Sequence, residues 1–235
     1  MKNWFYNSNI QFHLWDVTHL LTIGIILGLI VCVYLFRKKL IPIRGPIRII
    51  TGLLLILSRL SLDVWYITTN QWSAQSSLPF ELCSMASLLA GVMLLTKNRF
   101  LFEVLYFIAL SGAAMAIATP DLYFGFPQYR YIQFFFDHFL LILAPLLMIW
   151  LYHYRITWQS VLTSFLFLNG LAAMVYIVNH LISANYMFLS EKPGGMSLLD
   201  VLGPYPYYLL SLEVIAFVLF SLLYLPFLII KLKNK

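Results

Sequence analysis

Apolar residues fill most of the chain in long runs, and short polar segments separate one run from the next. An α-helix needs about 20 residues to cross the hydrocarbon core of a bilayer, and seven of the runs are close to this length. They cover residues 17–36, 47–68, 79–96, 100–119, 132–152, 157–179 and 206–230. The pattern predicts an all-α polytopic membrane protein, with residues 1–235 forming a single domain of seven transmembrane helices.

Composition agrees with this class and narrows the range of partners. The chain is 62% hydrophobic and only 10% charged, which is more apolar surface than one soluble core can hide. The net charge of +6 does not indicate nucleic acid, because the basic residues lie in short loops beside the apolar runs. In the first run the basic cluster Arg37-Lys38-Lys39 follows the apolar residues instead of preceding them, so we expect a retained helix and not a cleaved signal peptide.

The distribution of basic residues predicts the orientation. Alternate loops and the C-terminus hold Arg37, Lys38, Lys39, Arg44, Arg48, Lys97, Arg99, Arg155, Lys231, Lys233 and Lys235. The segments on the other side hold Lys2, Arg130 and Lys192. Because lysine and arginine accumulate on the cytoplasmic side, we expect a cell-membrane protein with its N-terminus outside and its C-terminus inside.

Ionisable and thiol side chains inside the predicted spans gather at one depth. An ionisable residue within a span is costly and therefore indicates function. A helix rises about 1.5 Å per residue, so the position of a residue within its span gives its depth in the membrane. By this count seven residues fall in the outer half, namely Arg59, Asp63, Glu81, Cys83, Asp137, His138 and Glu213. Glu103 alone lies near the inner end, close to Lys97 and Arg99. The clustering predicts a shared polar cavity that opens toward the outer leaflet.

Three of these residue types suit acyl transfer. A thiol attacks an ester as the thiolate, an imidazole can take its proton, and an acid can orient the imidazole. Cys83 and His138 supply the first two groups, and Glu81 and Asp137 are both candidates for the third. Neighbouring helical residues point about 100° apart, which makes Asp137 less well placed to orient His138. Asp137 is alternatively a partner for Arg59.

Each residue also has a structural interpretation. Arg59 and Asp63 are four residues apart on one helix face, so their pair either locks helices together or meets a lipid headgroup, with Glu213 as a candidate third member. Taken alone, His138 is typical of an interhelical hydrogen bond, and Cys83 is typical of a packing residue.

Metal and disulfide sites are not expected. His13, Asp16, His19 and His180 lie near the outer ends of two spans, but interfacial histidines explain them better than a zinc site does. Cys32 and Cys83 fall near opposite faces of the membrane, too far apart for a disulfide. We therefore expect no cofactor.

Four segments carry a resemblance to a known family. They are LPFELCSMASLLA, DHFLLILAPLLM, NYMFLSEKPGGMSLLDVLGPYPYYLL and LEVIAFVLFSLLYLPF, in this order. The chain resembles the bacterial YwaF family, whose eukaryotic relatives are the transmembrane protein 164 group. The resemblance implies a seven-helix fold and phospholipid acyltransferase activity through a cysteine and a histidine, with Cys83 and His138 at the matching positions. Asn185 and Tyr186, which open the third segment, join Arg59, Asp63 and Glu213 as predicted substrate-binding residues.

The predicted orientation sharpens the expected reaction. An outward-facing site has no acyl-CoA, so the acyl donor should be a membrane phospholipid. The chain would pass to Cys83 as a thioester and then to a lysophospholipid or another lipid acceptor. The alternative is a lipid or ion transporter that uses the same polar cavity without covalent chemistry, and a third possibility is a membrane assembly factor held together by its ion pairs.

Overall fold

The computed structural model describes residues 5–6, 10–192 and 201–233. Lys2, Lys235 and residues 193–200 of the third family segment lie outside the described residues. Within the described ranges the fold is all-α, and the β-type contact there is a single isolated bridge between Gln11 and Phe124.

Helices occupy the predicted apolar runs with ends that agree to within a few residues. They are α1 (Val17–Leu40), α2 (Arg44–Thr68), α3 (Leu82–Thr96), α4 (Arg99–Ala118), α5 (Tyr129–Tyr152), α6 (Trp158–Ile182) and α7 (Tyr207–Lys233), with the short 3-10 helices η1 (Ile41–Ile43) and η2 (Tyr186–Phe188). The prediction of an all-helical membrane protein is confirmed in this form.

The number of membrane crossings is not fixed by these helices. Within the described residues, five helical stretches are long and apolar enough to cross a membrane, and α1 and α2 count as one of them because they run together through η1 as residues Val17–Thr68. Helix α3 has only 15 residues and is the shorter apolar helix. Seven crossings and the N-outside orientation stay predictions.

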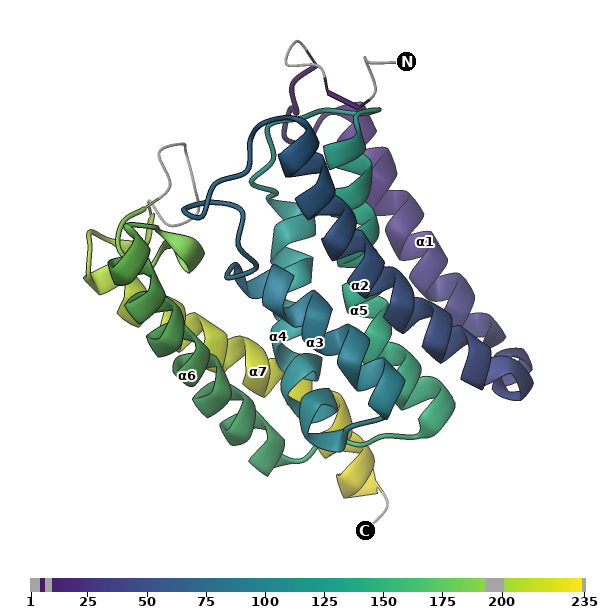
Figure 1. The fold of residues 1–235 in the computed structure, drawn as a ribbon. Coiled ribbons are helices and arrows are strands. Elements are labelled where there is room, and N and C mark those ends of the chain that lie inside the picture. The colour runs from purple at the N-terminus through teal and green to yellow at the C-terminus, as the bar shows by residue number, and fades with distance from the viewer. Residues whose placement is uncertain (1–4, 7–9, 193–200, 234–235) are drawn as a thin grey trace.

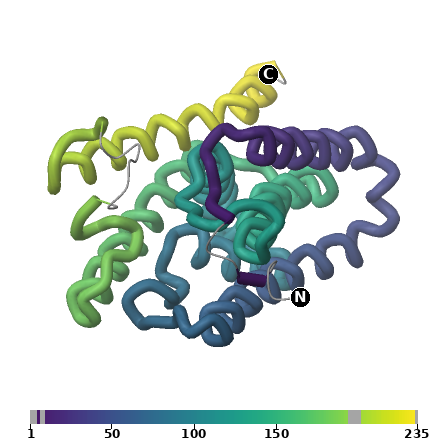
Figure 2. Tube along the Cα trace, turned by 90° about the horizontal axis from the view of Figure 1, so that it is seen from above, coloured from purple at the N-terminus to yellow at the C-terminus, as the bar shows by residue number. Residues whose placement is uncertain are grey.

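The helices form a bundle with α3, α4 and α5 at its centre (Figure 1). Helix α2 packs against α3 and α5, and α1 packs against α5. On the other side of the centre, α6 and α7 pack against α4 and against each other, so the view from above separates α1 from α6 (Figure 2). The described part of the chain begins and ends at opposite ends of the bundle (Figure 1).

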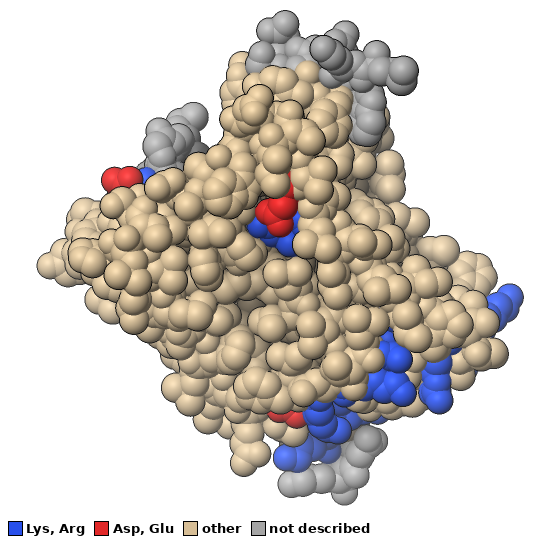
Figure 3. Space-filling model, viewed as in Figure 1, with Lys and Arg blue, Asp and Glu red and all other residues tan. Residues whose placement is uncertain are grey.

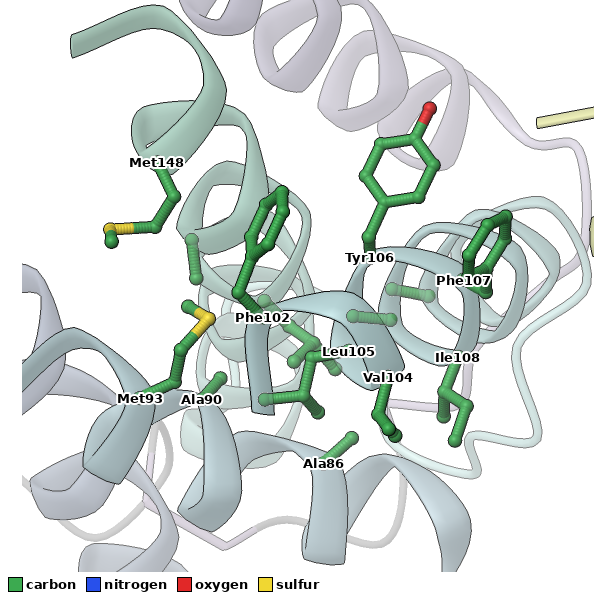
Figure 4. Close-up of a cluster of buried hydrophobic side chains, with 14 of the residues drawn as sticks. Ala86, Ala90, Met93, Phe102, Val104, Leu105, Tyr106, Phe107, Ile108 and Met148 are labelled. Atoms are coloured by element: carbon green, nitrogen blue, oxygen red, sulfur yellow. The ribbon is translucent and has the colours of Figure 1, made fainter. Parts of the chain in front are cut away.

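The core lies where α3, α4 and α5 meet. Small residues of α3, Ala86 and Ala90, let the larger side chains of α4 approach closely, and Phe102 and Leu105 fill the space (Figure 4). Met148 of α5 completes this cluster. Many apolar side chains on the outer faces of α1, α2, α6 and α7 are exposed, as expected of surfaces that lipid tails cover.

Two glycines allow α2 and α3 to cross closely. A Cβ atom added to Gly91 would lie 2.6 Å from Cγ1 of Ile56 and 3.0 Å from the carbonyl oxygen of Gly52. Contacts this short are not found between real side chains, so both helices need hydrogen alone at this point. The crossing fixes the position of α3, and α3 carries Cys83 at its other end.

We expect Gly91→Ala to lower the melting temperature of the detergent-solubilised protein. The added methyl group must push Ile56 and the backbone of Gly52 aside, and overpacking of this kind costs about 1–3 kcal/mol. Gly170→Ala is the matched control, because nothing lies within 4 Å of the added Cβ and alanine favours a helix over glycine. Equal melting temperatures for the two variants would contradict the close crossing.

The basic residues of the predicted inner loops gather at one end of the bundle, where most of the blue surface lies (Figure 3). Glu103 was predicted to be a partner for the basic residues at this end. This is confirmed for Arg99, whose Nε lies 3.3 Å from Oε1 of Glu103. The other carboxylate oxygen of Glu103 accepts a hydrogen bond from Ser160 of α6 at 3.0 Å.

Candidate functional site

The segment that precedes α3 is irregular, and polar side chains hold it in place. Arg59 of α2 donates from Nη2 to the carbonyl oxygen of Ser77 at 2.8 Å. The hydroxyl of Tyr186 accepts from the backbone N–H of Leu78 and donates to the carbonyl oxygen of Ala74, both at 2.9 Å. Because irregular backbone at membrane depth must be satisfied by the protein itself, these contacts define where α3 begins.

Cys83 is the second residue of α3 and follows Glu81, the N-cap residue, by two positions. The thiol faces α4, where a Cβ atom added to Gly112 would lie 3.8 Å from Sγ. The first N–H groups of a helix carry partial positive charge, but burial and the nearby carboxylates of Glu81 and Asp137 act against a thiolate at this position. Both Cys83 and Cys32 are free thiols.

His138 is buried in α5, and the hydrogen-bond partner of one of its ring nitrogens is defined. Nδ1 lies 2.7 Å from the carbonyl oxygen of Phe134, one turn earlier in the helix. A carbonyl oxygen only accepts, so Nδ1 carries the proton and Nε2 has the free lone pair that a general base needs. The ring also packs on Phe134 with a centroid distance of 4.1 Å.

The expected orienting acid is replaced by a backbone group. Across the described residues, neither Glu81 nor Asp137 hydrogen-bonds to the imidazole, and no hydrogen bond joins His138 to Cys83. The prediction that a carboxylate orients His138 is therefore wrong in this structure. The reason is geometric, because a histidine can reach the carbonyl four residues earlier in its own helix.

Asp137 connects α5 to α3. Its Oδ2 accepts a hydrogen bond from the buried hydroxyl of Ser87 at 2.6 Å, and Oδ1 is buried with no hydrogen-bond partner among the residues described. Asp137 forms no ion pair with Arg59 within these ranges, so that alternative is wrong. Ser87 is one turn below Cys83 on the same face of α3, which places the carboxylate of Asp137 on the Cys83 side of the helix.

Arg59 and Asp63 form the predicted ion pair, with Nη1 and Oδ1 2.8 Å apart. Acidic and basic atoms are visible together in a recess in the upper part of the face shown in Figure 3. The side chain of Arg59 is 5% exposed and that of Asp63 is 33% exposed. Arg59 therefore serves as a buried hydrogen-bond donor that links α2 to Ser77. The carboxylate of Asp63 is the member of the pair that is accessible to a ligand.

A cavity of about 790 Å³ lies between α4, α6 and α7. Most of its lining is apolar, and the polar residues in it are Glu81, Ser111, Asn169 and Glu213. Gly112, which faces the thiol of Cys83, is also part of the wall. The cavity therefore reaches the start of α3.

The prediction of one polar cavity shared by all the intramembrane charges is wrong. Glu81 and Glu213 line the cavity, but the other five residues of the predicted group do not, namely Arg59, Asp63, Cys83, Asp137 and His138. Glu213 does not join the Arg59 network, because its Oε2 accepts from Nδ2 of Asn169 at 2.9 Å. Glu81 and Glu213 therefore face one cavity, whereas Asp137 faces α3 and Arg59 pairs with Asp63.

Comparison with known proteins identifies the family. Residues 11–224 match the TMEM164 family. The chain belongs to the TMEM164 family. This confirms the resemblance found in the sequence, and the matched range contains every predicted site residue of this TMEM164-family protein.

A bacterial relative extends the comparison. The chain is 29% identical over 179 residues to an uncharacterized protein of Treponema pallidum (strain Nichols), and the match covers 75% of this chain and 73% of the relative. No solved structure matches the chain.

Asn185 and Tyr186 of the TMEM164-family protein shape the loop beside the cavity. Tyr186 is fully buried, and both its hydroxyl and its backbone are hydrogen-bonded, the backbone to Asn179. Asn185 accepts from the backbone N–H of Ser190 at 3.0 Å and donates to the carbonyl oxygen of Glu191 at 2.9 Å. These contacts give both residues structural roles, and the neighbouring residues 187–189 are the ones that line the cavity.

His19 and Asp16 at the start of α1 also have structural roles. Asp16 caps α1 by accepting from the backbone N–H of His19 at 2.7 Å, which lowers the pKa of this carboxyl. His19 is fully buried, not interfacial as expected. Its Nδ1 accepts from the backbone N–H of Trp15 at 3.1 Å, so Nε2 carries the proton and donates to the carbonyl oxygen of Ile117 at 2.9 Å.

Most residues that line the cavity were not singled out in the sequence, and among them are Ser111, Gly112 and Asn169. Asn169 could have been identified from the sequence as a candidate site residue, because a single amide within an apolar run needs a hydrogen-bond partner in the membrane. Ser111 bonds to the carbonyl oxygen of Phe107 in its own helix, as serines in membrane helices commonly do. Gly112 gave no signal, since its role depends on the side chain that faces it.

Proposed function

We propose that this TMEM164-family protein is a membrane-embedded acyltransferase of the transacylase type. It would move a fatty acyl chain from a phospholipid to a lysophospholipid or another lipid acceptor through a thioester on Cys83. The supporting observation is the largely apolar cavity of about 790 Å³, whose wall includes Gly112 next to the thiol. A cavity of this size and character suits an apolar ligand with a few polar contacts.

In the first half-reaction Nε2 of His138 removes the proton from Sγ of Cys83. The thiolate attacks the carbonyl carbon of the donor ester, and the resulting oxyanion collapses to break the bond to the glycerol oxygen. That oxygen leaves with the proton from His138 as the hydroxyl of a lysophospholipid, and the acyl chain stays on Sγ as a thioester. Because burial and the carboxylates of Glu81 and Asp137 act against a standing thiolate, the proton has to leave Sγ for His138 in the same step as the attack.

The second half-reaction reverses these steps with a new acceptor. The acceptor hydroxyl gives its proton to Nε2 of His138 and attacks the thioester carbonyl. The C–S bond breaks, the new ester forms and the Cys83 thiolate recovers the proton. Catalysis through these side chains requires His138 and Cys83 to come within hydrogen-bond distance when lipid is bound, as catalytic contacts often tighten only with substrate.

The orientation that we propose selects the donor. With the N-terminus outside, the start of α3 lies in the outer half of the cell membrane, where acyl-CoA is absent. Phospholipids are then the source of the acyl group and lysophospholipids are the acceptors, and no cofactor is needed. Limited access of water to the apolar cavity keeps hydrolysis of the thioester slow.

A reconstituted transfer assay tests the proposal. Purified protein is placed in vesicles with a phospholipid whose acyl chain carries one isotope label and a lysophospholipid whose headgroup carries another. We expect mass spectrometry to find phospholipid with both labels, formed without coenzyme A. A lipid transporter would move labelled lipid between leaflets and form no doubly labelled product, and that result would replace the proposed reaction with the transport alternative.

A further inference from the structure

Three cationic side chains surround one aromatic ring at the predicted inner end of the bundle. The guanidinium carbons of Arg44 and Arg48 lie 5.2 Å and 6.0 Å from the ring centre of Tyr152. Nζ of Lys97 lies 5.8 Å from the same centre. Arg44 and Arg48 belong to α2, and Lys97 directly follows α3. All three cationic groups therefore gather around the same ring.

Backbone contacts hold the two arginines in place. Arg44 donates from Nη1 to the carbonyl oxygen of Leu151 at 3.1 Å, and the hydroxyl of Tyr152 donates to the carbonyl oxygen of Arg44 at 3.0 Å. Arg48 donates from Nη1 to the carbonyl oxygen of Leu95 at 3.0 Å. Leu95 and Leu151 lie in the last turns of α3 and α5, whose partial negative charge also favours cations.

The carbonyl groups at these helix ends satisfy only part of the hydrogen-bonding capacity of the two arginines and do not neutralise their charge. A guanidinium has five N–H donors, and one of each arginine is accounted for by a carbonyl. Arg48 is only 8% exposed, and its Nε is buried without a hydrogen-bond partner in the part of the chain that the structure describes. Within that same part, the ion pairs are Arg59 with Asp63 and Arg99 with Glu103, so no carboxylate neutralises this cluster.

We infer that Arg44, Arg48 and Lys97 form a binding site for the phosphate of an anionic phospholipid at the inner membrane surface. Phosphate oxygens match the planar donors of arginine, and a lysine adds a point charge. Basic pockets between membrane helices on the cytoplasmic side favour anionic headgroups.

Apolar residues next to the cluster favour a lipid over free phosphate. Ile41 and Ile43 of η1 directly precede Arg44 and are exposed, and Leu95, whose carbonyl binds Arg48, is also exposed. A headgroup held by the three cations would thus have apolar surface beside it for the first carbons of its acyl chains. The site is at the opposite end of the bundle from Cys83, so it does not depend on the proposed reaction.

Native mass spectrometry of the full-length protein in detergent tests the site. The probes are phosphatidylglycerol, phosphatidylcholine with the same acyl chains, and inorganic phosphate alone. We expect phosphatidylglycerol to be retained in preference to phosphatidylcholine, and inorganic phosphate to bind far more weakly. In Arg44→Gln/Arg48→Gln we expect the affinity for phosphatidylglycerol to fall by about tenfold or more, as the loss of two charge-assisted contacts predicts.

The control removes the same charge from a neighbouring site. Lys38→Gln/Lys39→Gln lies at the end of α1, outside the cluster, and should retain phosphatidylglycerol like the wild type. If the arginine variant does not fold, Lys97→Gln gives the same comparison at an exposed position, with a smaller expected loss. Equal weakening in the control, equal retention of phosphatidylcholine, or equal affinity for inorganic phosphate would each overturn the inference.

Discussion

Cys83→Ala should abolish acyl transfer in the reconstituted assay and leave the protein folded. The proposed thioester needs a sulfur at this position, and alanine is small enough to fit the partly buried site beside Gly112. Wild-type protein incubated with a phospholipid that carries a labelled acyl chain should retain label on Cys83. Hydroxylamine at neutral pH should release that label, because it cleaves thioesters readily.

Two further variants make this result specific. Cys83→Ser should trap at most a slow oxyester that resists hydroxylamine, since an alcohol is a poor nucleophile without strong base assistance. Cys32→Ala is the control for loss of a thiol, because Cys32 is exposed on α1 far along the bundle and should transfer acyl chains at the wild-type rate. Full lipid remodelling by Cys83→Ala would exclude a covalent mechanism at this residue.

His138→Ala should lower the rate of transfer by about a hundredfold to ten-thousandfold, the range typical for loss of a general base. The hydrogen bond from Nδ1 to the carbonyl oxygen of Phe134 leaves Nε2 as the proton acceptor. The measurement is the initial rate of doubly labelled phospholipid under saturating lipid. Binding of lipid in the cavity should be unchanged, because His138 is not part of its lining.

His138→Asn separates a chemical role from a structural one. The amide nitrogen of asparagine takes the position of Nδ1 and can donate to the same carbonyl of Phe134, but asparagine has no basic nitrogen at the position of Nε2. We expect the same hydrogen bond to be kept together with the low rate of the alanine variant. Recovery of the rate in His138→Asn would assign His138 to packing and remove it from the mechanism.

Features that depend on neighbours along the chain were predictable. The apolar runs located each α-helix that the structure describes, though not the 3-10 helices η1 and η2, because a lipid-facing or buried α-helix shows its character in composition alone. The pairs Arg59 with Asp63 and Arg99 with Glu103 are both four residues apart, so helix geometry already brings them together.

Features that depend on which helices face each other were not predictable. Ser87 and Asp137 meet across 50 residues, and Asn169 and Glu213 meet across 44. Depth along a helix follows from counting residues, but the direction of a side chain around the helix needs the partner surface. For this reason the sequence grouped Glu213 and Asp137 with Arg59, and the structure separates all three.

The length of α3 has a consequence for the membrane itself. Its 15 residues span about 22 Å, which is short of the about 30 Å of a typical hydrocarbon core. Helix α3 is enclosed by the longer helices α2, α4 and α5, and it begins well below the top of α2 in Figure 1. The irregular residues 69–81 lead down from α2 to this start. Under the proposed reaction, the ester bond of a lipid has to descend below the ends of the neighbouring helices to meet the sulfur of Cys83.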